Sequence, residues 1–233
     1  MAMALLESGK INEQTVVPAP GSWSIPGTKH IFRDSVRSGH GSANLSKAIQ
    51  VSSDTFFYRL GFELGIEKTA PYLAAFGLGE RTGIDLPGEY RGILPSPAWK
   101  EKRWAKGSEK QKRWNPAEMV PVSIGQGYNT YTPLQMAHAT AILANNGVVF
   151  RPHLVKELLD HENQQITVID PKPERVLPYK QSNFNYVKRG MQLVLQGGGT
   201  AAKIGAGLRY TMGGKTGTAQ VVQIAQGKSY NAA

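Results

Sequence analysis

The tripeptide Lys215-Thr216-Gly217 constrains this chain more than any other feature of its sequence. It follows two glycines and leads into a run rich in valine and isoleucine that ends at Ile224. Such runs favour strands, so we expect a strand from Lys215 to Ile224. The edge of that strand can hold an anion, because the lysine supplies charge, the threonine a donor, and the glycine access to the backbone.

A phosphate-binding P-loop is the main competing interpretation, because Gly214-Lys215-Thr216 matches the end of that motif. A P-loop also needs a glycine five residues before Gly214, where this chain has Arg209, and a helix after the lysine. The residues after Lys215 favour a strand instead. The sequence therefore argues against a nucleotide site of this kind.

The composition is that of a globular chain. With 233 residues it can bury a core as one large domain or two small ones. It has no cysteine, which excludes disulfides and thiolate metal sites. No stretch approaches the length of a membrane span, and Met1–Leu6 lacks the basic region and cleavage site of a signal peptide. We expect Met1–Leu6 to be the tail of a helix that ends at Gly9, so that the chain begins inside a domain.

One segment contributes strongly to the formal net charge of +10. Seven lysines and arginines lie between Lys100 and Arg113, interleaved with Trp99, Trp104 and Trp114. Basic residues among aromatics can bind single-stranded nucleic acid, but no nucleic-acid motif accompanies them. We therefore expect a solvated surface loop with inward-facing tryptophans and no nucleic-acid partner. Attraction to an anionic surface, such as lipid headgroups or cell-wall polymer, is a further alternative.

Helical patterns occupy the region from about residue 42 to residue 147. Asn44 is expected to cap one helix, and Thr132 forms a capping box with Gln135 at the start of another. Residues 16–41 are rich in proline, glycine and serine and predict an extended loop. Later segments predict a hairpin between residues 153 and 169 and a helix that stops at Gly197. Helices mixed with a few strands, without regular βαβ alternation, predict the α+β class.

A second polar motif, Ser52-Ser53-Asp54, falls between two of the predicted helices. Residues at such a junction are held on both sides, which makes them suitable for a reactive hydroxyl. The structural alternative is that Ser52 and Asp54 only cap helices. The downstream Lys215-Thr216-Gly217 makes the functional interpretation the stronger one, because acyl transfer needs a nucleophile, a proton shuttle and oxyanion donors together.

Ser-x-Asn and Lys-Thr-Gly, with Ser-x-x-Lys, are the signature of penicillin-binding proteins and serine β-lactamases. Over nearly its whole length this chain resembles the transpeptidase domain of bacterial penicillin-binding protein 2, a class B penicillin-binding protein. The resemblance rests on Gly39-His40-Gly41, Ser52–Tyr58, Thr82–Pro87, Ile124–Tyr128, Thr132–Ala137 and Lys215–Gln220. It implies a penicillin-recognising fold, in which helices flank an antiparallel sheet.

The chain departs from the family pattern because no Ser-x-x-Lys occurs in its sequence. The resemblance implies that this nucleophile motif lies shortly before Met1 and that more strands and a helix follow Ala233. We therefore expect residues 1–233 to be a partial transpeptidase domain, incomplete at both ends and inactive alone.

The resemblance also implies roles for individual residues. Ser52 would relay a proton between the absent lysine and the leaving amine, Asp54 would orient that lysine, and Lys215 would hold Ser52. Thr216 would bind the terminal carboxylate of a D-Ala-D-Ala stem peptide. Gly217 would leave room for the peptide along the strand edge, and the Thr218 N–H would form half of the oxyanion hole.

The resemblance also raises the question of a metal, because some members of this family have a zinc site built from two aspartates, a histidine and a cysteine. The matching positions here are Ala19, Asp34, His40 and Ser53. Only two of these side chains can bind a metal, whereas structural zinc takes four protein ligands. We predict no metal and no cofactor, and expect His40 to hydrogen-bond with Asp34 or with a loop carbonyl.

The function implied by the resemblance is that of a peptidoglycan DD-transpeptidase of cell elongation. Its partners would be stem peptides, β-lactam antibiotics, and a membrane glycan polymerase with the elongation machinery. The full-length protein would be anchored in the bacterial inner membrane with a periplasmic catalytic domain. One alternative is a serine β-lactamase or β-lactam sensor of the same fold. Another is a non-enzymatic segment that binds cell-wall polymer or another polyanion through residues 100–113.

Overall fold

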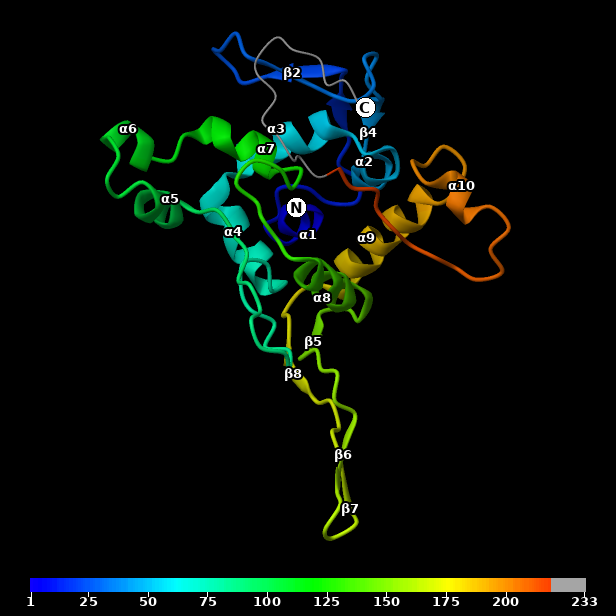
Figure 1. Ribbon diagram of the computed structural model, residues 1–233. Helices are drawn as coiled ribbons and strands as arrows, with labels where there is room; N and C mark the ends of the chain where they lie inside the picture. The colour runs from blue at the N-terminus through cyan, green and yellow to red at the C-terminus, as the bar shows by residue number, and fades with distance from the viewer. Residues whose placement is uncertain (219–233) are drawn as a thin grey trace, which may run out of the picture.

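The structure is a computed structural model that describes residues 1–218 (Figure 1). Helices and short antiparallel strands follow one another in groups along the chain, and the predicted α+β class is confirmed. The helices are α1 (Ala2–Glu7), α2 (Leu45–Val51), α3 (Asp54–Leu64), α4 (Ile66–Ala75), α5 (Pro97–Arg103), α6 (Glu109–Lys112), α7 (Met119–Val122), α8 (Pro133–Ala144), α9 (Gln181–Val194) and α10 (Ala202–Gly205). The strands are β1 (Val17–Ala19), β2 (Ser22–Ser24), β3 (Ile31–Arg33), β4 (Gly41–Ala43), β5 (Val148–Phe150), β6 (Glu157–Asp160), β7 (Gln165–Val168) and β8 (Pro173–Val176).

Within residues 1–218 the strands form two-stranded antiparallel pairs and no larger sheet: β1 with β4, β2 with β3, β5 with β8, and β6 with β7. The prediction of a loop over residues 16–41 is wrong, since β1, β2 and β3 lie there. Each of these strands has three residues, too few to show an alternating pattern between the prolines and glycines that surround them.

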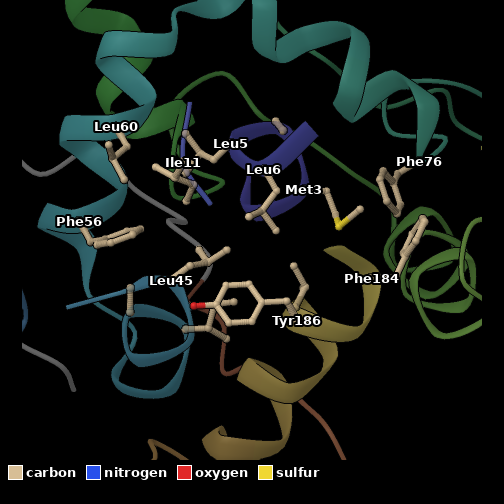
Figure 2. Close-up of a cluster of buried hydrophobic side chains, with 14 of the residues drawn as sticks. Met3, Leu5, Leu6, Ile11, Leu45, Phe56, Leu60, Phe76, Phe184 and Tyr186 are labelled. Carbon is tan, nitrogen blue, oxygen red and sulfur yellow. The ribbon is translucent and has the colours of Figure 1, made fainter. Parts of the chain in front are cut away.

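The main core lies where α1 is enclosed by α3, α4 and α9 (Figure 2). Leu5, Leu45, Phe56 and Phe184 are fully buried in it. Each comes from a different helix, namely α1, α2, α3 and α9, so the core ties these four helices together. Burying such side chains contributes about 1.5–3 kcal/mol each, which makes this core a firm support for the segments at its surface.

Both predicted caps are confirmed. The Asn44 side chain accepts a hydrogen bond from the Lys47 N–H at 2.9 Å, at the start of α2. At the start of α8, Thr132 and Gln135 make the two reciprocal bonds of a capping box. These bonds satisfy backbone donors that have no partner inside a helix. Both partners lie within three residues of each other, so the sequence alone can predict them.

The predicted hairpin is confirmed as β6 and β7, which project away from the helices at the bottom of Figure 1. Its first strand begins at Glu157, four residues later than expected at residue 153. The reason is Asp85, whose carboxylate accepts hydrogen bonds from the N–H groups of Leu154 and Val155 at 2.8 and 2.9 Å. Those N–H groups are therefore engaged outside the hairpin.

The basic segment is not a loop as expected, because α5 and α6 form within it. Ser96 caps α5 by accepting from the Trp99 N–H at 3.1 Å. The tryptophans do pack inward: the rings of Trp99, Trp104 and Trp114 lie 5.2, 5.7 and 6.2 Å from the ring of Tyr128. No helix within residues 1–218 is long and apolar enough to cross a membrane.

Candidate active site

The junction between α2 and α3 consists of two serines. Ser52 ends α2 in the left-handed conformation, with φ 56° and ψ 50°, which is rare for a residue with a side chain. Ser53 follows as the N-cap of α3 and is fully buried, whereas Ser52 is only half-buried. The reversal at Ser52 therefore sends adjacent side chains in different directions, one into the protein and one outward.

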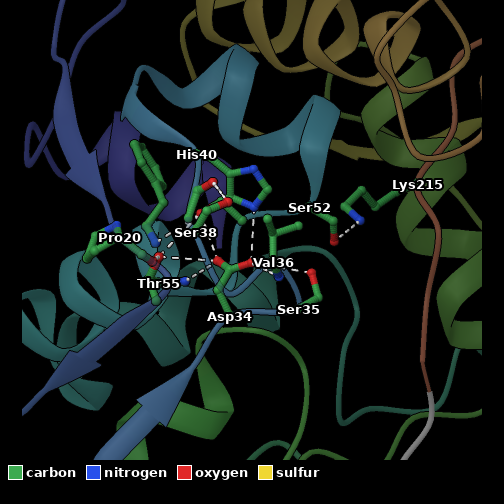
Figure 3. A network of polar contacts seen from close by, with 12 residues as sticks. Pro20, Asp34, Ser35, Val36, Ser38, His40, Ser52, Thr55 and Lys215 are labelled. Atoms are coloured by element: carbon green, nitrogen blue, oxygen red, sulfur yellow. Dashed lines mark hydrogen bonds and ion pairs between the residues drawn. The ribbon is translucent and has the colours of Figure 1, made fainter.

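Ser52 meets Lys215, which lies 163 positions further along the chain. The Lys215 ammonium donates a hydrogen bond to Ser52 Oγ at 2.7 Å (Figure 3). It also donates to the Thr216 carbonyl oxygen at 3.0 Å and to Thr216 Oγ1 at 3.3 Å. The predicted convergence of the two motifs on one place is confirmed.

Asp54, the first residue of α3, is the acidic group nearest this pair in sequence. Burial raises the pKa of Asp54 to about 6, with a further increase from the negative charge of Asp34, while Lys215 and His40 act in the opposite direction. Partial burial lowers the pKa of Lys215, and Asp54 opposes that change. An acid and a base whose pKa values both move toward neutrality are typical of sites that transfer protons.

The segment from Lys215 to Thr218 has irregular backbone, not the predicted strand. A strand needs a neighbour for its ladder of hydrogen bonds, and no described strand pairs with this segment. The remainder of the predicted strand, residues 219–224, lies outside the described residues. The segment is held instead by α9, since the Gly214 N–H donates to the Met191 carbonyl oxygen at 3.1 Å.

Comparison with known proteins decides the family. The family described as "Penicillin binding protein transpeptidase domain" matches residues 1–233, the whole chain. The chain belongs to the penicillin-binding protein transpeptidase family.

Among curated members of this family, the peptidoglycan D,D-transpeptidase MrdA of Acinetobacter baumannii is 40% identical over 237 residues, covering 100% of this chain and 33% of that protein. MrdA of Escherichia coli K12 is 36% identical over 233 residues, covering 100% of this chain and 36% of that protein. The chain thus spans about a third of the length of these relatives.

Solved structures of the family agree. The chain is similar to Pseudomonas aeruginosa PBP2 in complex with WCK 5153, with a TM-score of 0.82 and 37% identity over 94% of this chain and 48% of that one. It is also similar to PBP2 of Helicobacter pylori in complex with MreC, with a TM-score of 0.78 and 35% identity over 94% of this chain and 38% of that one. The resemblance to penicillin-binding protein 2 is confirmed.

The buried carboxylate of Asp34 lies beside the junction and contacts Ser53 (Figure 3). Its Oδ2 accepts hydrogen bonds from Ser53 Oγ and the Thr55 N–H, each at 3.2 Å. Thr55 Oγ1 also lies 3.2 Å from this oxygen, but its hydrogen has a shorter bond to the Pro20 carbonyl oxygen at 2.7 Å. Its Oδ1 accepts from the Val36 N–H at 3.2 Å and lies 3.0 Å from His40 Nε2. The expected contact between Asp34 and His40 is confirmed.

Burial alone would raise the pKa of Asp34, but hydrogen bonds from Thr55, Val36 and His40 and the charge of His40 outweigh it and lower the pKa below its ordinary value. Asp34 is therefore an ionised carboxylate at neutral pH, enclosed by donors. It fastens the segment that carries β3 to the start of α3.

The residues around Asp34 do not fit a zinc ion. Within residues 1–218 no three histidines, cysteines or acidic residues lie together as possible ligands. Both oxygens of Asp34 are engaged by protein donors, and Ala19 and Ser53 occupy the other two compared positions. A tetrahedral zinc site would lack two of its four protein ligands. The absence of a metal cofactor stays a prediction.

Two residues near the site were not found from the sequence. The Gln50 side chain donates to the Gly197 carbonyl oxygen at 3.1 Å, and Thr200 Oγ1 lies 3.0 Å from Thr216 Oγ1. The three consecutive glycines before Thr200 predict only the end of a helix. A polar residue directly after such a turn is the signal that could have indicated a role.

Proposed function

We propose that the full-length protein containing these 233 residues is a peptidoglycan D,D-transpeptidase of the penicillin-binding protein 2 type. The observation that carries the proposal is the 2.7 Å hydrogen bond from Lys215 Nζ to Ser52 Oγ in a chain of this family. The relative from Acinetobacter baumannii is a peptidoglycan D,D-transpeptidase, which supports the same reaction for this protein.

The direction of that hydrogen bond fits a proton shuttle. Because Ser52 Oγ accepts from Lys215, the hydroxyl retains its own hydrogen for donation to another group. In acyl transfer, the serine of a Ser-x-x-Lys motif attacks the penultimate D-alanine carbonyl of the donor stem peptide and loses its proton to the lysine of that motif. Ser52 receives this proton and passes it to the departing D-alanine amine, while the acyl group stays on the serine. Such relays contribute about 10²- to 10⁴-fold.

Asp54 would accept hydrogen bonds from the motif lysine and from the donor peptide. Its carboxylate is partly desolvated, as its raised pKa indicates, so it interacts more strongly with a nearby cation than an exposed carboxylate would. We therefore assign Asp54 the role of orienting the lysine.

The residues after Lys215 would bind the substrate. Lys215 supplies positive charge and Thr216 a hydroxyl for the terminal carboxylate, while a side chain is absent at Gly217, where an added Cβ would meet nothing within 4 Å. The Thr218 N–H would serve as one oxyanion donor, worth about 3–4 kcal/mol in the transition state.

In the second half-reaction a neighbouring stem peptide's amine would take up the acyl group, which restores the serine and forms the cross-link. β-Lactams would acylate the same serine. By analogy with the relative whose structure is a complex with MreC, we propose that the full-length protein works with elongation proteins and a membrane glycan polymerase. We also propose a membrane anchor outside these residues, with the domain in the periplasm.

Fluorescent penicillin tests the proposal. A full-length protein that contains residues 1–233 and a Ser-x-x-Lys motif should form a stable covalent adduct, whereas residues 1–233 alone should not. Labelling of residues 1–233 alone would mean that the nucleophile lies elsewhere in them. Rapid hydrolysis of penicillin by the full-length protein would favour a β-lactamase, and no reaction at all would overturn the proposal.

A further inference from the structure

The turn between α9 and α10 contacts both halves of the candidate site. On one side it binds Gln50, two residues before Ser52: the Gln50 side chain donates to the Gly197 carbonyl oxygen at 3.1 Å, and the Thr200 N–H donates to the Gln50 carbonyl oxygen at 3.2 Å. On the other side Thr200 Oγ1 lies 3.0 Å from Thr216 Oγ1. One turn thus bridges the end of α2 and the segment of Lys215.

Glycine makes this bridge possible. A Cβ atom added at Gly199 would lie 2.3 Å from the carbonyl oxygens of both Leu193 and Val194, so no other residue fits there without movement. The turn folds back tightly over the end of α9, where the Ala201 N–H donates to the Val194 carbonyl oxygen at 2.9 Å. Backbone hydrogen bonds therefore hold Thr200 on both sides, and they fix the position from which its side chain extends.

The hydroxyl of Thr216 has two lone pairs and one hydrogen. Lys215 Nζ donates to Thr216 Oγ1 at 3.3 Å, which occupies one lone pair. If Thr200 donates to the other, the Thr216 hydrogen is left to point away from both neighbours, toward an incoming anion. Ser52 is similar in this respect, because its hydroxyl accepts a hydrogen bond from Lys215 and keeps its own hydrogen available for donation.

We propose that Thr200 is a positioning residue that orients the Thr216 hydroxyl as a donor to the carboxylate of the substrate or of a β-lactam. This inference rests on the proposed function, because it presumes that Thr216 binds that carboxylate. Thr200 does not touch the reacting atoms; it acts through Thr216.

Stopped-flow acylation of the full-length protein by a carboxylate-bearing β-lactam separates the two steps, non-covalent binding and acylation. Thr200→Val removes the hydroxyl at nearly constant volume and should weaken binding about 3- to 10-fold, as expected for one lost hydrogen bond, with a smaller effect on the acylation rate constant. Thr200→Ser keeps the hydroxyl and should restore binding. Thr140→Val is the matched control, since its hydroxyl bonds the Met136 carbonyl oxygen on the exposed side of α8.

A double-variant cycle tests whether Thr200 acts through the Thr216 hydroxyl. In a Thr216→Val protein, the further change Thr200→Val should have no effect on binding, because the hydroxyl that it orients is gone. Unchanged binding in Thr200→Val alone, or an equal loss with and without the Thr216 hydroxyl, would overturn the inference while leaving the proposed function intact. An unmodified protein that β-lactams do not acylate would overturn the proposed function, and this inference with it.

Discussion

Asp34 accepts a hydrogen bond from the Ser53 hydroxyl at 3.2 Å, next to Ser52, whose hydroxyl accepts from Lys215 in the proposed site. Ser53 stands between Ser52 and Asp54, so the buried carboxylate fixes the backbone from which both candidate catalytic side chains extend. The position of the candidate site therefore depends on a buried residue outside it.

Replacing Asp34 by alanine should destabilise the full-length protein by about 3 kcal/mol, because the buried donors of Ser53, Thr55 and Val36 would lose their acceptor. Urea denaturation measures the change. Asp160→Ala, at the exposed turn of the β6–β7 hairpin, is the control and should cost far less. Equal losses in the two variants would show that the Asp34 contacts contribute nothing special.

The pH dependence of this stabilisation follows from the lowered pKa of Asp34. The folded pKa lies below the unfolded value of about 3.9, so the stabilisation is fully present above that value and is lost as the pH falls through the folded pKa. The difference in unfolding free energy between the unmodified protein and Asp34→Asn should be constant from pH 7 to pH 5 and shrink toward pH 3. A difference that grows on acidification would contradict the assignment.

The change of stability with pH that Asp54 causes should have the opposite sign. Its pKa is raised to about 6 in the folded state, so between about 4 and 6 the folded protein binds more protons than the unfolded one and stability falls as the pH rises. Asp54→Asn should therefore stabilise the protein at pH 7 by about 1 kcal/mol, a figure reduced for partial solvent screening, while it slows acylation. Thermal denaturation at pH 7 and at about pH 3.5 measures the effect, which should nearly vanish at the lower pH, where the carboxyl is protonated in both the folded and the unfolded state. Destabilisation at pH 7 would mean that the carboxylate contributes to folding.

Ser52→Ala and Lys215→Ala should each slow acylation of the full-length protein by roughly 10²- to 10⁴-fold, because each removes one end of the hydrogen bond that prepares the proton relay. Their combination should cost little more than either alone, since the two act as one unit. Lys203→Ala, in the exposed last turn of α10, is the control for loss of a lysine. Rates near normal in either single variant would remove the assigned roles.

The sequence predicted the parts of the fold that depend on local chemistry. Asn44 and Thr132 revealed two helix starts because a cap is a bond within three residues. The convergence of Ser52 with Lys215 was also predicted, through the motifs of a known family. It could not have been calculated from spacing, because 163 positions separate the two residues.

Other features escaped prediction for physical reasons. The Asp34 hydrogen bonds join irregular backbone to α3 across 19 and 21 positions, and no periodic pattern accompanies them. The short strands β1 to β3 are stabilised by pairing with other strands, which overrides weak local preference. Helices α5 and α6 begin at the serine caps Ser96 and Ser108, which are local signals that the high charge of the segment obscures. The role of Thr200 escapes prediction because the three residues before it are glycines, which indicate a turn without indicating what the turn positions.

The contact between Gly61 and Ser123 gives a test of the packing that supports α3. A Cβ atom added at Gly61 would lie 2.0 Å from Ser123 Oγ and 2.7 Å from its Cβ, so α3 and α7 can approach only because Gly61 has no side chain. Alanine favours a helix over glycine by about 1 kcal/mol, yet Gly61→Ala should destabilise the protein by about 2 kcal/mol, because overpacking exceeds that gain.

Adding Ser123→Gly removes both clashing atoms and should recover much of the loss, although it also removes the 2.7 Å bond from Ser123 Oγ to the Met119 carbonyl oxygen. Denaturation of both single variants and the double variant measures the coupling, and strictly additive effects would show that the two helices do not meet as described.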